Sequence, residues 1–513
     1  MRRAVAAVLM SSWVLAIPGA DTGPQQLAQQ PVPIRPIPAK VEPEKPPEIE
    51  PIYSMRQKVQ WGIDHLISLK KQGLSDYDVS QVRILDASAI PAKWRSDWLR
   101  VLDFTFNSST LEPEVSHFQA VPNSHGLLWF FFLDQFGLDR GTWERVSGRE
   151  PFYVEPLVLP DQAAAVRSLL GTRQLPRLNV QLIVRADWLF RDLSDLTRSN
   201  TYTDFLFAPY NKGSGKIPRN LDDWDDVFGA KAVNDFLRRS GFDSRQGAVV
   251  EDGTSIVASQ NRLIIQTAIP TRLNGKKSQT LDVLQTAGNG DFTETRNRNF
   301  QFDFSELFYT LPNGGRAAAL ANNKGKLLAK ADSDIAVNRL AAGQHARFTV
   351  YAPGSCVLCH PSGVNIPHNA LADLRASGVK INFLRKQDAI ADSAFFFSDL
   401  EKQMKNDQGL YADFVARTSG FAPAENSKQY GLFTAWYDQK LDAAQAAREL
   451  GVDRDVLLEL LVDGFRKASA PGISLASPKA RLHQLATGST IPRSVWEFSA
   501  YNEIGLLLRA AGK

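Results

Sequence analysis

The chain has 513 residues, of which 43% are hydrophobic and 22% are charged, and its formal net charge at pH 7 is +4. Its length and apolar content are sufficient for roughly two to four domains with buried cores, far more than a bare electron carrier needs. The net charge is small for this length and no run of basic residues occurs. Nucleic acid is therefore excluded as an expected partner.

The N-terminus has the pattern of an export signal followed by a tether. Arg2 and Arg3 precede an apolar stretch from Ala4 to Ile17, which predicts residues 1–20 as a signal peptide, with an uncleaved anchor as the alternative. Residues 21–51 are rich in Pro, Gln and Glu, a composition typical of a flexible or polyproline tether. We expect a periplasmic or otherwise exported protein whose tether allows association with a membrane surface.

The following part of the chain is predicted to be α+β. Helical periodicity is expected over 52–73, 94–107 and 161–170, and apolar runs predict strands at 125–133 and 178–184. Short strands are expected at 300–304 and 307–311, with a turn at 312–315, and residues 317–321 and 326–329 are expected to be short elements on either side of a further turn at 322–325. These patterns define an N-terminal mixed α/β region, 52–200, and a central β-containing region, 201–345.

Helical patterns dominate the last third of the chain. The candidates are 370–376, 393–405, 410–418, 429–441, 442–450 and 453–465. Gly451 is placed to end one of these helices, and Asp453 is placed to cap the next. We expect a mainly α-helical region, 346–425, around the cysteine motif, and a C-terminal helical region, 426–513.

Both cysteines of the chain fall in one pentapeptide, Cys356-Val357-Leu358-Cys359-His360. This is the spacing by which a c-type haem is attached. Thiols about one helical turn apart can each form a thioether to a haem vinyl group, and the adjacent histidine can bind the iron as proximal ligand. The motif predicts one covalent haem c, held by Cys356, Cys359 and His360.

A disulfide and a small metal site also use two cysteines at this spacing. The strand-like segment 347–351 precedes the motif, as it would in a redox-active disulfide. Pro361 and Gly363, however, would break the helix that such a pair opens. Zinc would need further ligands, and the chain has no second Cys-x-x-Cys. Haem attachment is favoured, and both alternatives stay open.

The second axial position of the iron decides the chemistry. Met404 is the candidate, because a downstream methionine is the usual distal ligand of soluble carriers. His368 is the main rival, and the other histidines are 65, 117, 125, 345 and 483. Six-coordinate iron favours electron transfer, whereas an open position would let oxygen, peroxide or nitric oxide bind.

Polar clusters elsewhere are weaker candidates. Arg185, Asp187 and Arg191 could line a haem propionate or a substrate cleft, although a structural ion-pair cluster is favoured. Asn261 and Arg262 could likewise line a haem propionate or a substrate cleft, or belong to a structural polar cluster. The acidic residues of 222–226 lack the spacing of a calcium loop and are expected to form a solvated turn.

Several segments resemble a group of large secreted bacterial mono-haem c-type cytochrome proteins, largely uncharacterised, with a long region before the haem site. The segments are 184–189 (VRADWL), 259–262 (SQNR), 305–314 (SELFYTLPNG), the haem motif and 491–497 (IPRSVWE). The resemblance implies haem binding and electron transfer to an unidentified redox partner protein. An envelope oxidoreductase that passes electrons from a substrate to the haem, and a haem-based gas sensor, are the alternatives.

Overall fold

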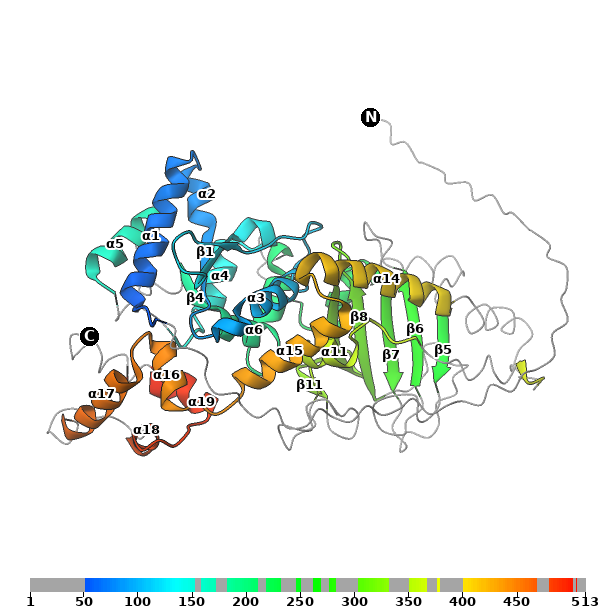
Figure 1. The fold of residues 1–513 in the computed structure, drawn as a ribbon. Helices are drawn as coiled ribbons and strands as arrows, with labels where there is room; N and C mark the ends of the chain where they lie inside the picture. The colour runs from blue at the N-terminus through cyan, green and yellow to red at the C-terminus, as the bar shows by residue number, and fades with distance from the viewer. Residues whose placement is uncertain are drawn as a thin grey trace. The chain divides into compact units, whose positions relative to one another are not determined.

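The protein is a mixture of helices and sheets, as expected for an α+β chain, and is described from a computed structural model (Figure 1). The described residues are 51–152, 158–171, 182–210, 218–231, 246–250, 262–268, 276–282, 303–331, 350–366, 376–378, 400–467, 479–501 and 504. All of them belong to one compact unit, Lys45–Lys513. The expected signal peptide, 1–20, and all but the last residue of the expected tether, 21–51, lie outside the described residues.

The N-terminal helix α1, Met55–Lys71, confirms the prediction for 52–73. It begins where the side chain of Ser54 accepts a hydrogen bond from the backbone of Gln57, and the Gln57 side chain bonds back to the Ser54 backbone. This reciprocal capping satisfies two free N–H groups of the first turn. Of the predicted apolar face of α1, Met55, Val59, Ile63 and Leu66 are buried, whereas Ile67 is exposed.

A four-stranded sheet follows, with the strand order β2 (Gln119–Ala120), β3 (Leu128–Phe132), β1 (Val82–Asp86) and β4 (Ile183–Arg185). Strand β1 is antiparallel to β3 and parallel to β4. The helices of this part are α2 (Asp76–Gln81), α3 (Ala92–Asn107), α4 (Arg140–Ser147), α5 (Pro160–Leu169) and α6 (Ala186–Leu193), with the 3-10 helix η1 (Leu133–Phe136). The predicted helices at 94–107 and 161–170 are confirmed as α3 and α5.

The strand predicted at 125–133 is shorter than expected, because a turn occupies its first residues. Leu127 donates a backbone hydrogen bond to Ser124 at 3.0 Å, and His125 has a φ of 54°. An extended strand cannot contain this left-handed residue. Of the strand expected at 178–184, residues 183–184 lie in β4 and 178–181 lie outside the described residues.

The central sheet is a six-stranded antiparallel meander (Figure 1). Its strands in spatial order are β10 (Leu327–Leu328), β9 (Arg316–Asn322), β8 (Phe304–Thr310), β7 (Lys276–Asp282), β6 (Arg262–Ala268) and β5 (Gln246–Val250). Of the strand expected at 300–304, residues 300–302 lie outside the described residues, and Phe304 belongs to the same strand as the segment expected at 307–311. Residues 304–310 are continuous in β8, because each of them pairs with a residue of β9.

The predicted turns of this sheet are confirmed. Leu311 donates to the carbonyl of Gly315 at 2.8 Å, and Gly314 has a φ of 93° that favours glycine. The second turn, at 322–325, joins β9 to β10. Helices α7 (Thr201–Leu206) and α9 (Leu221–Val227) precede the sheet in the chain, and the small ladder of β11 (Lys330–Ala331) and β12 (Val350–Tyr351) follows it.

The C-terminal part is helical, as expected. Its elements are α11 (Gly354–Cys359), α14 (Leu400–Ser419), α15 (Pro423–Tyr437), α16 (Ala443–Leu450), α17 (Arg454–Lys467), α18 (Lys479–Ala486), α19 (Arg493–Val495) and the π-helix η6 (Trp496–Ala500). Gly451 ends α16 with a φ of 69°, as predicted. Of the helix predicted at 370–376, only residue 376 is described.

Of the helix expected at 393–405, residues 393–399 lie outside the described residues, and the rest forms one helix with 410–418, since α14 runs unbroken through Gly409. A mid-helix glycine costs about 1 kcal/mol relative to alanine. Packing offsets this cost, because the rings of Tyr411 and Phe414 lie 6.5 Å and 5.8 Å from Phe104 of α3. Helix α14 also contacts strand β5 and therefore spans the sheet (Figure 1). Helix α15 begins six residues before the expected 429, with Pro423 in its first turn.

The largest hydrophobic core joins the N-terminal and C-terminal parts of the chain. Trp98 of α3 stacks on Phe433 of α15 at 4.6 Å and also contacts Phe190 of α6. No helix among the described residues is long and apolar enough to cross a membrane.

Candidate functional site

The cysteine motif forms a short helix that is anchored at its start. The backbone N–H of Gly354 donates to the carbonyl of Ser194 at 2.9 Å. A Cβ added at Gly354 would lie 2.5 Å from that carbonyl oxygen, so only glycine fits here. Helix α11 ends at Cys359, and Gly363, with a φ of 89°, follows. The helix stops after the motif, as Pro361 and Gly363 predict.

The two thiols lie one turn apart on α11, and both are free. Cys356 is buried and Cys359 is half-buried. Burial, reinforced by the negative charge of Glu306, raises the pKa of Cys356 well above its usual range. The same two causes raise the pKa of Cys359 to about 12. Both side chains are therefore thiols at neutral pH.

His360 caps α11 and turns its ring toward strand β8. Its Nε2 lies 3.3 Å from Oε1 of Glu306, and its ring centroid lies 4.8 Å from that of Phe308. Its Nδ1 is buried and has no hydrogen-bond partner among the described residues. One ring nitrogen is thus held by a carboxylate, and the other is available to a further ligand.

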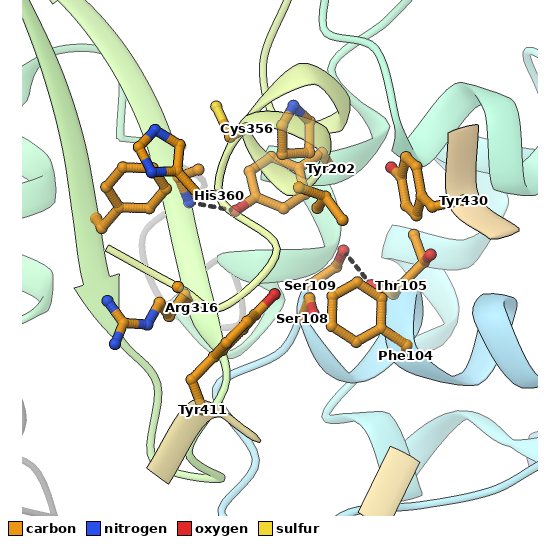
Figure 2. A pocket seen from close by; sticks show the side chains of 15 residues that line it. Phe104, Thr105, Ser108, Ser109, Tyr202, Arg316, Cys356, His360, Tyr411 and Tyr430 are labelled. Carbon is orange, nitrogen blue, oxygen red and sulfur yellow. Dashed lines mark hydrogen bonds between the residues drawn. The ribbon is translucent and has the colours of Figure 1, made fainter. Parts of the chain in front are cut away.

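A cavity of about 30 Å³ lies beside the motif. Cys356 and His360 line it, together with the aromatic side chains Phe104, Tyr202, Phe308, Tyr411 and Tyr430. Figure 2 shows His360 and Arg316 on one side of this cavity and Tyr430 and Thr105 on the other. The lining combines an apolar wall with the donor atoms of the motif.

Arg316, the first residue of β9, supplies the positive charge at the cavity. Its Nη2 donates to the carbonyl of Asp407 at 2.9 Å, and its guanidinium lies 5.3 Å from the ring centre of Tyr411. The guanidinium packs so closely on Gly363 that an added Cβ there would lie 3.0 Å from it. Burial lowers the pKa of Arg316. The cation remains charged but poorly solvated, which favours an anionic partner.

Met404 lies close to the motif. It is 1% exposed and belongs to the same small hydrophobic cluster as Cys356, Phe308 and Val364. This methionine shares a cluster with Cys356 but, like Cys359, is not among the residues that line the cavity. His368 and His345 lie outside the described residues. The other described histidines, at 65, 117, 125 and 483, do not line the cavity.

The residues present fit a covalent haem in their donor chemistry. They offer two thiols one helical turn apart, an adjacent imidazole with an unpartnered buried nitrogen, an aromatic wall and a cation. The cavity of about 30 Å³ has room for a few water molecules at most and is far too small for a haem. A haem would therefore enter only if the neighbouring segments separate.

The other predicted polar cluster is structural. Arg185 forms buried ion pairs with Asp187 and Glu449, and Glu449 also accepts from Arg493 at 2.8 Å and from Trp496 at 2.6 Å. Arg191 pairs with Asp195 and Asp438 at 2.9 Å and 2.8 Å. These guanidinium groups already have carboxylate partners, as the favoured ion-pair interpretation predicted.

The acidic segment 222–226 lies in a helix and not in the expected turn, although Asp222, Asp223 and Asp226 are exposed to solvent, as expected. Asn220 caps α9 by accepting from the backbone of Asp223 at 2.9 Å. Asp225 is buried, where it accepts from Lys277 at 2.8 Å and from Tyr309 at 2.7 Å. Asn261 lies outside the described residues, and nothing is described of the side chain of Arg262.

Comparisons with protein-family models, with curated proteins and with solved structures found no match for this chain.

Sequence reasoning missed Glu306 and Arg316 as members of the site. Both lie on strands that approach the motif only through the tertiary fold. The sequence does carry a signal for Glu306, since it is the one charged residue of 304–310. A single carboxylate in an otherwise uncharged strand indicates a polar partner.

Proposed function

We propose that the protein is an exported c-type cytochrome that binds one covalent haem and transfers electrons to a redox partner protein. The observation that carries this proposal is the arrangement of α11, on which two free thiols lie one turn apart and His360 follows at the helix end. Disulfides and metal sites do not require a histidine at that position. The resemblance of several segments to secreted mono-haem proteins supports the same conclusion.

Cys356 and Cys359 would hold the haem by thioethers. Each S–H adds across one vinyl group, so that a sulfur–carbon bond forms, the hydrogen moves to the terminal vinyl carbon, and no electron is lost. His360 would bind the iron, and Arg316 would pair with a propionate carboxylate. Met404 is our proposed distal ligand. When bound, haem supplies reversible one-electron exchange.

The chain's own contribution is to bury and orient these groups. The aromatic wall, with Phe104, Tyr202 and Tyr430, gives the motif an apolar neighbour on the side of the cavity. A low dielectric strengthens the influence of each nearby charge on the iron. Glu306 and Arg316, of opposite charge, would therefore both tune the reduction potential. We propose that residues 346–425 form the haem-binding region and that strands β8 and β9 complete its wall.

A redox-active disulfide is the competing function for the motif. Reactive Cys-x-x-Cys pairs depend on a lowered thiol pKa, since the thiolate is the nucleophile. Here burial and Glu306 raise the pKa of Cys359 to about 12, which is the opposite direction. A helix of six residues also provides little of the dipole that lowers thiol pKa values in such proteins. This electrostatic environment argues against disulfide exchange and leaves haem attachment as the better supported function.

The test is to express the protein with a haem maturation system and to measure the mass of the denatured chain. We expect the mass of one haem on the wild type and on Val357→Ala, a control within α11. The double variant Cys356→Ser/Cys359→Ser should carry none, and each single variant should carry a less stable attachment. Covalent haem on the double variant would refute the assignment.

Export is a separate part of the proposal. The pattern of residues 1–20 supports a signal peptide, and cytochrome c maturation requires passage across the cytoplasmic membrane. Cell fractionation should find the haem-bearing chain outside the cytoplasm, and replacing Arg2 and Arg3 by Glu should retain it inside without haem. Haem-bearing protein in the cytoplasmic fraction would contradict this.

A further inference from the structure

The contact between His360 and Glu306 joins the haem motif to the central sheet. Glu306 lies in the middle of β8, where its neighbours Ser305 and Leu307 are fully buried. Its backbone N–H donates to Oγ1 of Thr280 on β7 at 2.9 Å. Side chains alternate along a strand, so Glu306 and Phe308 project from the same face of β8. Both reach His360, one through its carboxylate and the other through its ring.

This pair of contacts restricts the imidazole from two directions. The carboxylate of Glu306 is 14% exposed and the side chain of His360 is 13% exposed. Their interaction is therefore poorly screened by solvent. The Phe308 ring lies at 64° to the imidazole, in an edge-on arrangement. A central strand with neighbours on both sides is a rigid support for such contacts.

We propose that Glu306 is the positioning residue of the haem ligand, and that it accepts a hydrogen bond from whichever ring nitrogen of His360 does not bind the iron. This inference rests on the proposed function. A histidine ligand usually donates its second ring N–H to a carboxylate, a carbonyl or a water, which fixes the ring and increases its basicity. Of these acceptors, the structure places a carboxylate within reach.

The charge of this hydrogen-bond acceptor affects the reduction potential of the iron. A full negative charge on the acceptor makes the imidazole a stronger electron donor, which favours the oxidised iron more than the reduced iron. Glu306 therefore lowers the reduction potential of the site. The proposed function requires only that the haem exchange electrons. The charge of Glu306 would in addition determine in which direction the protein shifts the reduction potential.

The test compares Glu306→Gln with wild-type holoprotein. Glutamine keeps the shape and an acceptor oxygen but removes the charge. We expect the equilibrium constant for one-electron reduction to rise about tenfold, or 59 mV. Glu306→Asp should restore most of the wild-type value. The control is Glu425→Gln, which removes an equal charge from a carboxylate of α15 that is 39% exposed; it should change the constant less than twofold.

A second readout distinguishes the hydrogen bond from charge alone. In the reduced, diamagnetic protein, the ring N–H proton of His360 should exchange with solvent at least tenfold faster in Glu306→Leu, which has no acceptor atom, than in the wild type. Unchanged exchange in Glu306→Leu, an unchanged potential in Glu306→Gln, or an equal shift in Glu425→Gln would overturn the inference. Wild-type protein without covalent haem would instead overturn the proposed function, and the inference with it.

Discussion

Met404 of α14 and Cys356 of α11 are buried in one cluster, 1% and 2% exposed respectively. The thioether of the proposed distal ligand is therefore near the thiol that would anchor the haem. The other buried members of this cluster come from β8, β9, the loop after the motif and α14: Phe308, Ala318, Val364 and Leu400. The proposed iron site thus combines side chains of α11 and α14 with side chains of β8 and β9, the two strands that the turn at 312–315 joins.

Replacing Met404 by Leu should open the second axial position. Leucine conserves the volume, so the stability cost should be below about 1.5 kcal/mol. Reduced Met404→Leu holoprotein should bind carbon monoxide readily, whereas the reduced wild type should resist it. Met55→Leu, in the buried face of α1, is the matched control and should behave as wild type. Equal carbon monoxide binding by wild type and Met404→Leu would exclude Met404 as the ligand.

Replacing Arg316 by Gln should make the haem harder to reduce. Loss of a buried cation leaves the propionate charge uncompensated, which favours the oxidised iron. We expect the equilibrium constant for reduction to fall by about threefold to tenfold, the latter equivalent to 59 mV. Arg417→Gln, at a side chain of α14 that is 43% exposed, should have little effect. A higher potential in Arg316→Gln would contradict this assignment.

The haem-free protein should react slowly with iodoacetamide. Because the pKa of Cys359 is raised from 9.0 to about 12, its thiolate fraction at pH 8 is at least about 100-fold lower than in the unfolded chain. The alkylation rate should keep rising tenfold per pH unit through pH 10, and urea should abolish the protection. A rate that reaches a plateau by pH 9.5 would show an ordinary or lowered thiol pKa.

The buried carboxylate of Glu449 should make the protein sensitive to acid. Burial by itself raises its pKa, but Arg185 and Arg493 outweigh burial and lower the pKa of Glu449 from 4.5 to about 2. Since the folded pKa is the lower one, the stability from this group is complete above about pH 4.5 and is lost as pH falls toward 2. The shift corresponds to roughly 3 kcal/mol at neutral pH.

Glu449→Gln should therefore destabilise the fold by about 3 to 5 kcal/mol at pH 7, because it leaves two buried guanidinium groups short of a partner. Urea unfolding followed by circular dichroism measures this loss. Glu401→Gln is the control, since that carboxylate is 66% exposed and should contribute less than about 1 kcal/mol. A loss at Glu449 no larger than at Glu401 would show that the ion pairs are energetically unimportant.

The sequence predicted those features that depend on nearby residues. Helices α1 and α3 followed from apolar periodicity, and the end of α16 followed from Gly451, because both signals are local. It could not predict that α14 continues through Gly409, since the compensating contacts come from Phe104 in α3.

The residues of the candidate site also include some that local sequence predicts and some that only the tertiary fold brings in. Cys356, Cys359 and His360 were evident from spacing alone, whereas Glu306 belongs to the site only because β8 packs against α11. The ion pair of Arg185 with Glu449 joins residues 264 positions apart, and no local pattern carries that information. Long-range pairing is thus what the sequence alone leaves unspecified.

The central claim is that this chain carries one covalent haem. The most direct measurement is a pyridine haemochrome assay on the wild type, matured with the haem attachment machinery and then extracted with acid acetone, together with oxidised and reduced absorption spectra. We predict one haem per chain that resists extraction, with a low-spin spectrum in the reduced state. Complete removal of haem by the extraction would contradict the account and return Cys356 and Cys359 to the disulfide interpretation.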